Sequence, residues 1–184
     1  MRNFLKPNKN ILFNSCNGCI DCCKNYPFMP LFLDEFKSAH SHFPIVFAKI
    51  NNAKYALAVL FDNKDSCRYL KNGICDNYSN RLSGCKIYPI IPYEDDIFYD
   101  ESCKALNFKT GVPLFKDDEA NEPFYNSRLE NFSQKRKELV CFLENIWNEL
   151  IFYKNIKDVD ILSYNFSTDN EFLKYHQASL CHIL

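Results

Sequence analysis

The clearest periodic pattern in the chain is a run of apolar residues at three- and four-residue steps between Asn126 and Asn155. Such spacing is typical of a helix that buries one face, and Ser127-Arg-Leu-Glu130 matches the capping box that starts many helices. The pattern predicts one long helix with Cys141 as a buried thiol within its stripe. The apolar positions are Leu129, Phe132, Leu139, Leu143, Ile146, Trp147 and Leu150.

Shorter apolar runs predict strands. Ile45 to Ile50 and Tyr55 to Phe61 are rich in aliphatic, β-branched and aromatic residues, and Asn51-Asn52-Ala53-Lys54 separates them. Two such runs around a short polar connection indicate a β-hairpin. Val159 to Tyr164 has the same composition and predicts a late strand.

Two further helices complete the predicted elements. Leu31 to His42 is amphipathic, and Thr168-Asp-Asn-Glu171 matches a second capping box that would open a final helix through Cys181. We therefore expect an α+β fold, with a small, mostly antiparallel sheet, cysteine-rich metal-binding loops and a long C-terminal helix.

Composition bounds the class of protein. A chain of 184 residues with 47% hydrophobic residues is long and apolar enough for one domain with a core. The formal net charge of −1 gives no attraction to nucleic acid, so none is expected as a partner. We predict a single domain over residues 1–184, with a cysteine cluster region at 16–105 and a helical part at 126–184.

No stretch predicts a membrane span or a secretory signal. Met1 to Ser15 is polar with interspersed charges, and no segment reaches the roughly 18 apolar residues that a spanning helix needs. We therefore predict a cytoplasmic protein without membrane contact. Cytosolic thiols are kept reduced, so the ten cysteines favour metal binding over disulfides. A disulfide-rich exported domain is the alternative.

The ten cysteines include two groups that point to chemistry. Cys16-Asn-Gly-Cys19-Ile-Asp-Cys22-Cys23 places four thiols at the spacing C-x-x-C-x-x-C-C, which suits zinc or an iron–sulfur cluster. Adjacent side chains in extended chain point apart, so Cys22 and Cys23 would need an unusual turn to share one ion. Glycines precede cysteines at Gly18, Gly73 and Gly84, as expected of loops that wrap a metal. The second group is Cys67, Cys75, Cys85 and Cys103.

Together the two groups resemble the CxxCxxCC, or YkgJ-type, cysteine cluster family, which is described as a zinc- or iron-chelating domain. Beyond the first group, the resemblance rests on Cys67 with Tyr69 and Leu70, on Gly73 and Cys75, and on Tyr78, Arg81, Cys85, Tyr88-Pro89 and Cys103. Leu82 and Lys86 depart from the proline and arginine usual in that family. The resemblance extends distantly to a flagellin lysine N-methylase, which implies a metal-dependent or iron–sulfur enzyme as an alternative.

These observations predict a cytoplasmic metal-binding protein, structural, chelating or metal-handling, with the metal ion as its partner. The spacing C-x-x-C-x-x-C favours iron over zinc. Arg81 is the candidate to contact the cofactor, because its charge would offset that of the thiolates. The number of centres, any catalytic activity, its substrate, a protein partner and the oligomeric state stay open. The candidate metal ligands are Cys16, Cys19, Cys22, Cys23, Cys67, Cys75, Cys85 and Cys103.

Overall fold

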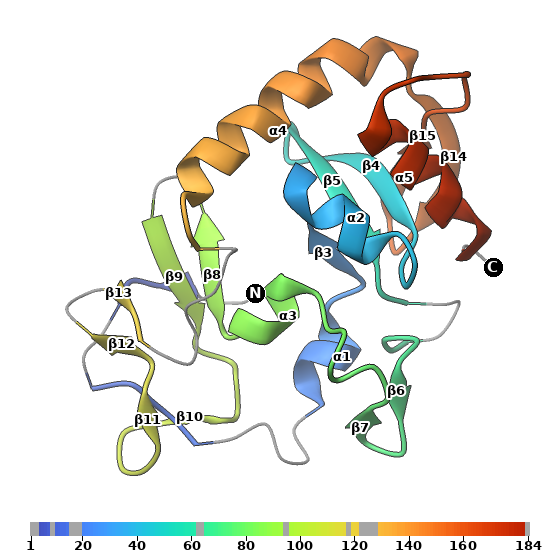
Figure 1. The fold of residues 1–184 in the computed structure, drawn as a ribbon. Helices are drawn as coiled ribbons and strands as arrows, with labels where there is room; N and C mark the ends of the chain where they lie inside the picture. The colour runs from blue at the N-terminus through green and yellow to red at the C-terminus, as the bar shows by residue number, and fades with distance from the viewer. Residues whose placement is uncertain are drawn as a thin grey trace. The chain divides into compact units, whose positions relative to one another are not determined.

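The computed structural model describes residues 4–7, 10–14, 20–61, 65–93, 96–116, 119–121 and 129–182 (Figure 1). The chain divides into two compact units, each made of two segments. The first unit consists of Met1–Asn25 and Tyr69–Ser133, and the second of Tyr26–Arg68 and Gln134–Leu184. The single domain expected over residues 1–184 stays a prediction.

The second unit is built on a five-stranded antiparallel sheet with the order β14-β15-β4-β5-β3. Asn51 and Asn52 both have positive φ, of 49° and 66°, which is the backbone of a tight turn whose twist matches the strands that it joins. The predicted hairpin is therefore confirmed, and Lys157 and Asp158 make a similar turn in the next hairpin. The strands are β3 (Phe28–Pro30), β4 (Ile45–Ile50), β5 (Ala53–Val59), β14 (Ile151–Ile156) and β15 (Val159–Ser163).

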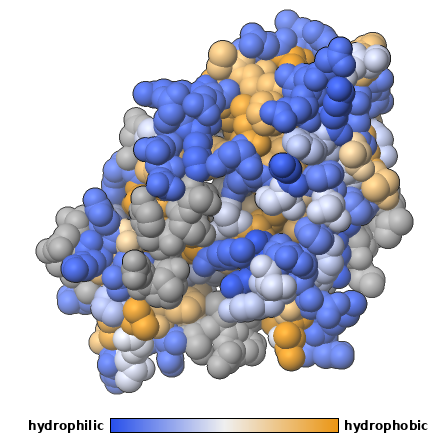
Figure 2. All heavy atoms as spheres, viewed as in Figure 1, coloured by the Kyte–Doolittle hydropathy of each residue, from blue (hydrophilic) through white to orange (hydrophobic). Residues whose placement is uncertain are grey.

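Helices pack on this sheet through aromatic side chains. Phe47 of β4 lies 6.4 Å, between ring centroids, from Phe142, which in turn meets Phe36 and Phe172 edge to face at 6.4 and 5.8 Å. Edge-to-face rings of this kind stabilise a core beyond the area that they bury. Figure 2 shows apolar side chains reaching the surface beside α4. The helices are η1 (Leu33–Glu35), α2 (Phe36–Ala39), α4 (Phe132–Ile146), η2 (Trp147–Glu149), α5 (Glu171–Ser179) and η3 (Leu180–His182).

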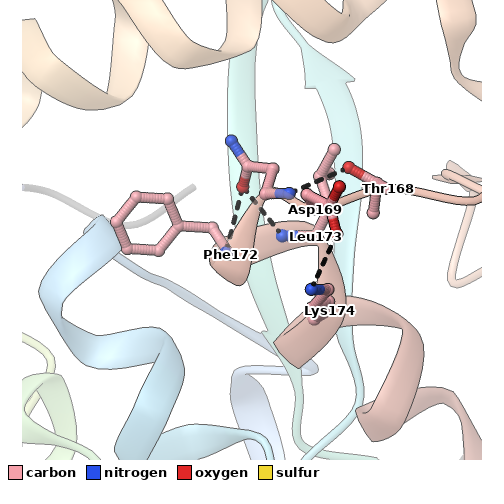
Figure 3. Close-up of polar contacts among 6 residues, drawn as sticks. Thr168, Asp169, Phe172, Leu173 and Lys174 are labelled. Atoms are coloured by element: carbon pink, nitrogen blue, oxygen red, sulfur yellow. Dashed lines mark hydrogen bonds and ion pairs between the residues drawn. The ribbon is translucent and has the colours of Figure 1, made fainter.

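Asn170 caps the N-terminus of helix α5. Figure 3 labels Phe172 and Leu173 in the first turn of this helix. The side-chain oxygen of Asn170 accepts hydrogen bonds from the amides of Phe172 at 3.0 Å and Leu173 at 3.2 Å. These amides have no partner within the helix, so the asparagine satisfies them. Thr168, predicted to cap the helix, instead accepts from the Asn170 amide at 3.1 Å. The predicted helix is confirmed, and its capping residue lies two positions later.

His176 of α5 joins two strands of the sheet from inside the core. Its side chain is fully buried, its Nδ1 donates to the Ile45 carbonyl at 2.7 Å, and its Nε2 accepts from the Tyr164 amide at 3.0 Å. Ser179, one turn later, accepts from the Ile45 amide at 2.8 Å. The helix thus satisfies backbone groups at the ends of β4 and β15, where the two strands no longer pair with each other.

The first unit contains short strands and two short helices. Its apolar core includes Ile11, Ile87, Ile90, Tyr99 and Leu114. The sheets have the orders β1-β9-β8 and β10-β2-β11, with two separate hairpins, β6-β7 and β12-β13. The elements are β1 (Phe4–Leu5), β2 (Leu12–Phe13), α1 (Asp21–Asn25), β6 (Leu70–Lys71), β7 (Ile74–Cys75), α3 (Ser83–Ile87), β8 (Ile90–Tyr93), β9 (Asp96–Asp100), β10 (Leu106–Asn107), β11 (Val112–Pro113), β12 (Phe115–Lys116) and β13 (Glu119–Ala120).

The fold is therefore mixed α and β, with several small antiparallel sheets and one long helix near the C-terminus, as expected in outline. The long helix is shorter than predicted, because it ends at Ile146 and Ile151–Ile156 forms β14. Cys141 is exposed, since Leu139 and Leu143 carry the buried face. None of the helices in the described ranges is long and apolar enough to cross a membrane.

Candidate functional site

The first unit carries most of the cysteines singled out in the sequence. Cys22 and Cys23 lie half-buried in α1, Cys75 ends β7, Cys85 lies in α3, and Cys103 is buried shortly after β9. Cys67 belongs to the second unit, where it pairs with Phe61 in an isolated antiparallel bridge. Cys16 and Cys19 fall outside the described residues.

Cys22 and Cys23 form a close pair of thiols. Their sulfur atoms are 3.9 Å apart, and either thiol can donate to the other. This interaction lowers the pKa of Cys22 to about 7, against the opposing effect of burial. The backbone amides of Cys23 and Cys22 and the positive charge of Arg81 lower the pKa further. At neutral pH Cys22 is therefore present to a large extent as thiolate, the form of cysteine that acts as a nucleophile.

Arg81 comes to this pair from the segment before α3. Its Nε donates to the Tyr78 carbonyl at 3.3 Å, and the centre of its guanidinium lies 3.7 Å from the centroid of the Tyr78 ring. Stacking on an aromatic face and a bond to a nearby carbonyl together restrict the arginine side chain. The planar cation is thereby held with one face on tyrosine and within electrostatic reach of the Cys22 sulfur.

A salt bridge connects α1 to the segment that carries Cys103. Lys104 lies 3.0 Å from a carboxylate oxygen of Asp21, the residue just before Cys22. Both side chains are at least partly exposed, so the pair contributes little to stability. It does show that two segments more than 80 residues apart in sequence meet beside the thiol pair.

Asp100 fixes the backbone around Cys103. Its fully buried carboxylate accepts from the Tyr88 hydroxyl at 3.0 Å, and from the Ser102 amide at 3.0 Å and hydroxyl at 2.6 Å. The amide of Cys103 donates to the Asp100 carbonyl at 3.2 Å. A buried carboxylate needs several donors of this kind to be retained. Asp100 thus joins the turn at Cys103 to the segment that follows α3.

The sequence named the cysteines of α1 and Arg81 as candidate site residues, and these roles stay predictions. It did not identify Tyr78 as the ring on which Arg81 lies. It also missed Asp21 and Lys104. A signal for them was present, since each is the immediate neighbour of a candidate cysteine and the two carry opposite charge. His176, read from the sequence as a bystander to a metal site, is a buried structural residue in the second unit.

The predicted metal centre has no support in the described part of the chain. There, no group of three or more histidine, cysteine, aspartate or glutamate side chains is arranged to hold a metal ion. Cys22 and Cys23 contact each other, and Cys67 lies in the second unit. The roles predicted for Cys16 and Cys19 fall on residues outside the described ranges. No metal-binding loop is found among the residues that are described.

The described residues define a mixed α and β protein with one pair of adjacent thiols in its first unit. A family model with the description SapC matches residues 9–140, more than half of the 184-residue chain. The chain belongs to the SapC family. No curated protein and no solved structure matches it.

The family match corrects the interpretation drawn from the cysteine spacing. The chain is not a member of the CxxCxxCC, or YkgJ-type, family. The zinc or iron–sulfur function inferred from that resemblance is wrong for two reasons. The family is a different one, and the described residues contain no metal-binding group. The alternative of an enzyme related to the lysine N-methylases depended on the same resemblance and has no support.

Proposed function

We propose that the first unit carries a thiol-reactive site in which Cys22 is the nucleophile for exchange with a disulfide. The observation that carries this proposal is the pair of half-buried sulfur atoms 3.9 Å apart in α1. Reactive cysteines lie in partly exposed surroundings next to cations, whereas inert ones lie in apolar cores. Cys22 has a thiol donor on one side and the charge of Arg81 nearby.

The chemistry is a single exchange of sulfur partners. The Cys22 thiolate attacks one sulfur of a disulfide R–S–S–R, a new bond forms between Cys22 and that sulfur, and the other half leaves as the thiolate RS⁻. An attacking thiol is most effective when its pKa is near the ambient pH. The pKa of about 7 for Cys22 meets this condition at neutral pH.

Cys23 supports the reaction as a hydrogen-bond donor. The Cα atoms of consecutive residues are about 3.8 Å apart, below the span of about 4.4–6.8 Å that ordinary disulfides need. A bond between Cys22 and Cys23 would therefore require α1 to change its backbone. We infer that a different thiol, R′SH, loses its proton to solvent and attacks the mixed disulfide as R′S⁻, which forms R–S–S–R′ and releases the Cys22 thiolate.

This chemistry fits a reducing compartment, where small thiols are abundant. We therefore propose a cytoplasmic location.

Mapped modification of the thiols tests the proposal. The protein is treated with a limiting amount of the neutral disulfide 2,2′-dithiodipyridine at pH 7, and the modified cysteines are identified by peptide mass spectrometry. We expect Cys22 to react before Cys141 and Cys181, which are more exposed, because reactivity follows thiolate content more than exposure. Cys23→Ala should slow the reaction of Cys22 at pH 7, since it removes the largest contribution that lowers the pKa.

Elemental analysis of the same sample separates this function from metal binding. A thiol-reactive Cys22 requires that the purified protein contain no zinc or iron in stoichiometric amount. Stoichiometric metal that is released when Cys22 is modified would contradict the proposal. Preferential reaction of Cys141 and Cys181, with Cys22 untouched, would contradict it equally.

A further inference from the structure

The side chain of Arg81 is fixed through its Nε, while its two terminal nitrogens have no partner among the described residues. Its Nε donates to the Tyr78 carbonyl at 3.3 Å, and its flat face lies 3.7 Å from the Tyr78 ring centroid. Among the residues that the structure describes, no hydrogen bond or ion pair engages the two terminal nitrogens of Arg81. Those nitrogens form the fork that binds a carboxylate through two parallel hydrogen bonds.

Three acidic side chains of the first unit already have partners of their own. Asp21, next to Cys22, pairs with Lys104 at 3.0 Å, and Asp76 pairs with Lys71 at 2.6 Å. The carboxylate of Asp100 is buried and occupied by Tyr88 and Ser102. Within the described ranges, the positive charge of Arg81 is therefore available to a ligand.

The ring beneath Arg81 adds an apolar surface to this cation. Tyr78 is 59% exposed and Ile74 69% exposed, in the segment that leads to Arg81. An exposed aromatic face with a fixed guanidinium above it suits a ligand that combines an anionic group with an organic body. The charge of Arg81 also acts on the Cys22 sulfur, so the cation and the thiol pair belong to the same part of the first unit.

We propose that the disulfide that reacts with Cys22 carries a carboxylate, and that Arg81 binds this carboxylate while Tyr78 holds the guanidinium in place. This inference rests on the proposed thiol function and names the class of its substrate. In this arrangement Arg81 is a substrate-binding residue, and Tyr78 is a positioning residue that acts through it. A disulfide without a carboxylate lacks this anchor and reacts more slowly.

Three disulfides of different charge test the inference. The probes are 5,5′-dithiobis(2-nitrobenzoate), which carries carboxylates, neutral 2,2′-dithiodipyridine, and cationic cystamine. The rate constant for modification of Cys22 is measured with each probe for the unaltered protein and for Arg81→Met. The ratio of the two rate constants removes the intrinsic reactivity of each probe.

We expect Arg81→Met to slow the carboxylate probe by about tenfold more than the neutral probe, the size of one charge-assisted hydrogen bond. The neutral probe reports the part of the loss that comes from altered thiolate content. The rate constant for cystamine should fall by no more than the rate constant for the neutral probe. Arg81→Lys should restore only part of the difference, because an ammonium cannot bind both oxygens in one plane.

Lys86→Met is the matched control, since Lys86 is an exposed cation on α3 and its loss changes net charge by the same amount. Lys86→Met should leave the ratio of the rate constants for the carboxylate and neutral probes unchanged. An equal loss for all three probes in Arg81→Met would overturn carboxylate binding and leave the thiol function standing. Failure of Cys22 to react with any of the probes would overturn both.

Discussion

Protonation of His176 should unfold the second unit as the pH falls. The imidazole is fully buried, donates to the Ile45 carbonyl and accepts from the Tyr164 amide. Burial is the main cause that lowers its pKa from 6.5 to about 4, while the hydrogen bond to the Ile45 carbonyl acts in the opposite direction. A protonated ring would turn a second N–H towards the Tyr164 amide, which is itself a donor.

The direction of the pH dependence follows from proton uptake. In the unfolded chain the histidine gains a proton as the pH falls through 6.5, whereas the buried ring stays neutral down to about 4. The unfolded state binds more protons across this interval, so the free energy of unfolding decreases as the pH falls. The stabilisation is complete above pH 6.5, and a pKa difference of this size corresponds to about 3 kcal/mol lost by pH 4.

Urea unfolding at a series of pH values between 4 and 8 measures this effect. His176→Gln should lower stability at pH 7 by about 1–3 kcal/mol, because it disturbs buried hydrogen bonds. The same variant should show a flatter fall between pH 6.5 and 4 than the unaltered protein.

Ser179→Ala is the control for this prediction. Ser179 lies on the same helix and accepts from the Ile45 amide, but it does not titrate. Its loss should lower stability by about 1 kcal/mol at every pH and leave the slope unchanged. An identical pH dependence in His176→Gln and in the unaltered protein would refute the reasoning.

Two further predictions concern the backbone. Asn170→Ala should lower the free energy of unfolding by about 1 kcal/mol, because it removes the acceptor for the amides of Phe172 and Leu173; an unchanged urea midpoint would refute this role. Gly111→Ala should cost at least about 2 kcal/mol, since φ is +125° and a Cβ would collide with the Phe13 carbonyl. Gly73→Ala is the comparison, with φ +78° and open space around the Cβ, and should cost about 1 kcal/mol; equal losses would contradict the collision.

The hairpin of the second unit was predictable because its information is local. Asparagine tolerates positive φ, and Asn51 and Asn52 stand between two apolar runs. The final helix was predictable for a similar reason. The identity of its capping residue was not predictable, because threonine and asparagine are both good caps. In the structure, Asn170 caps the helix and Thr168 accepts from the Asn170 amide.

The end of the long helix shows where periodicity fails. Trp147 and Leu150 continue the three- and four-residue spacing, yet Ile151–Ile156 pairs with β15. Isoleucine, phenylalanine and tyrosine favour strands, and Lys157-Asp158 provides a turn that returns the chain to the sheet. Pairing with β15, the next strand along the chain, decides the outcome.

The sequence drew attention to residues of the candidate site, but it did not reveal how their side chains are arranged. The spacing C-x-x-C-x-x-C-C drew attention to Cys22 and Cys23, and the charge of Arg81 suggested that an anionic group lies nearby. The spacing does not reveal that α1 brings the two sulfur atoms to 3.9 Å of each other, nor that Arg81 stacks on Tyr78. Cysteine spacing alone therefore indicated metal, whereas the arrangement of the described side chains supports a thiol pair.

The most direct test of the thiol-reactive site is the pH dependence of the reaction of Cys22 with 2,2′-dithiodipyridine between pH 5 and 10. The rate should rise to a plateau with a midpoint near 7, the pKa that Cys23 and Arg81 give to Cys22, and Cys23→Ala should move this midpoint upward. A midpoint near 9, the ordinary value for cysteine in the absence of these neighbours, would contradict the account.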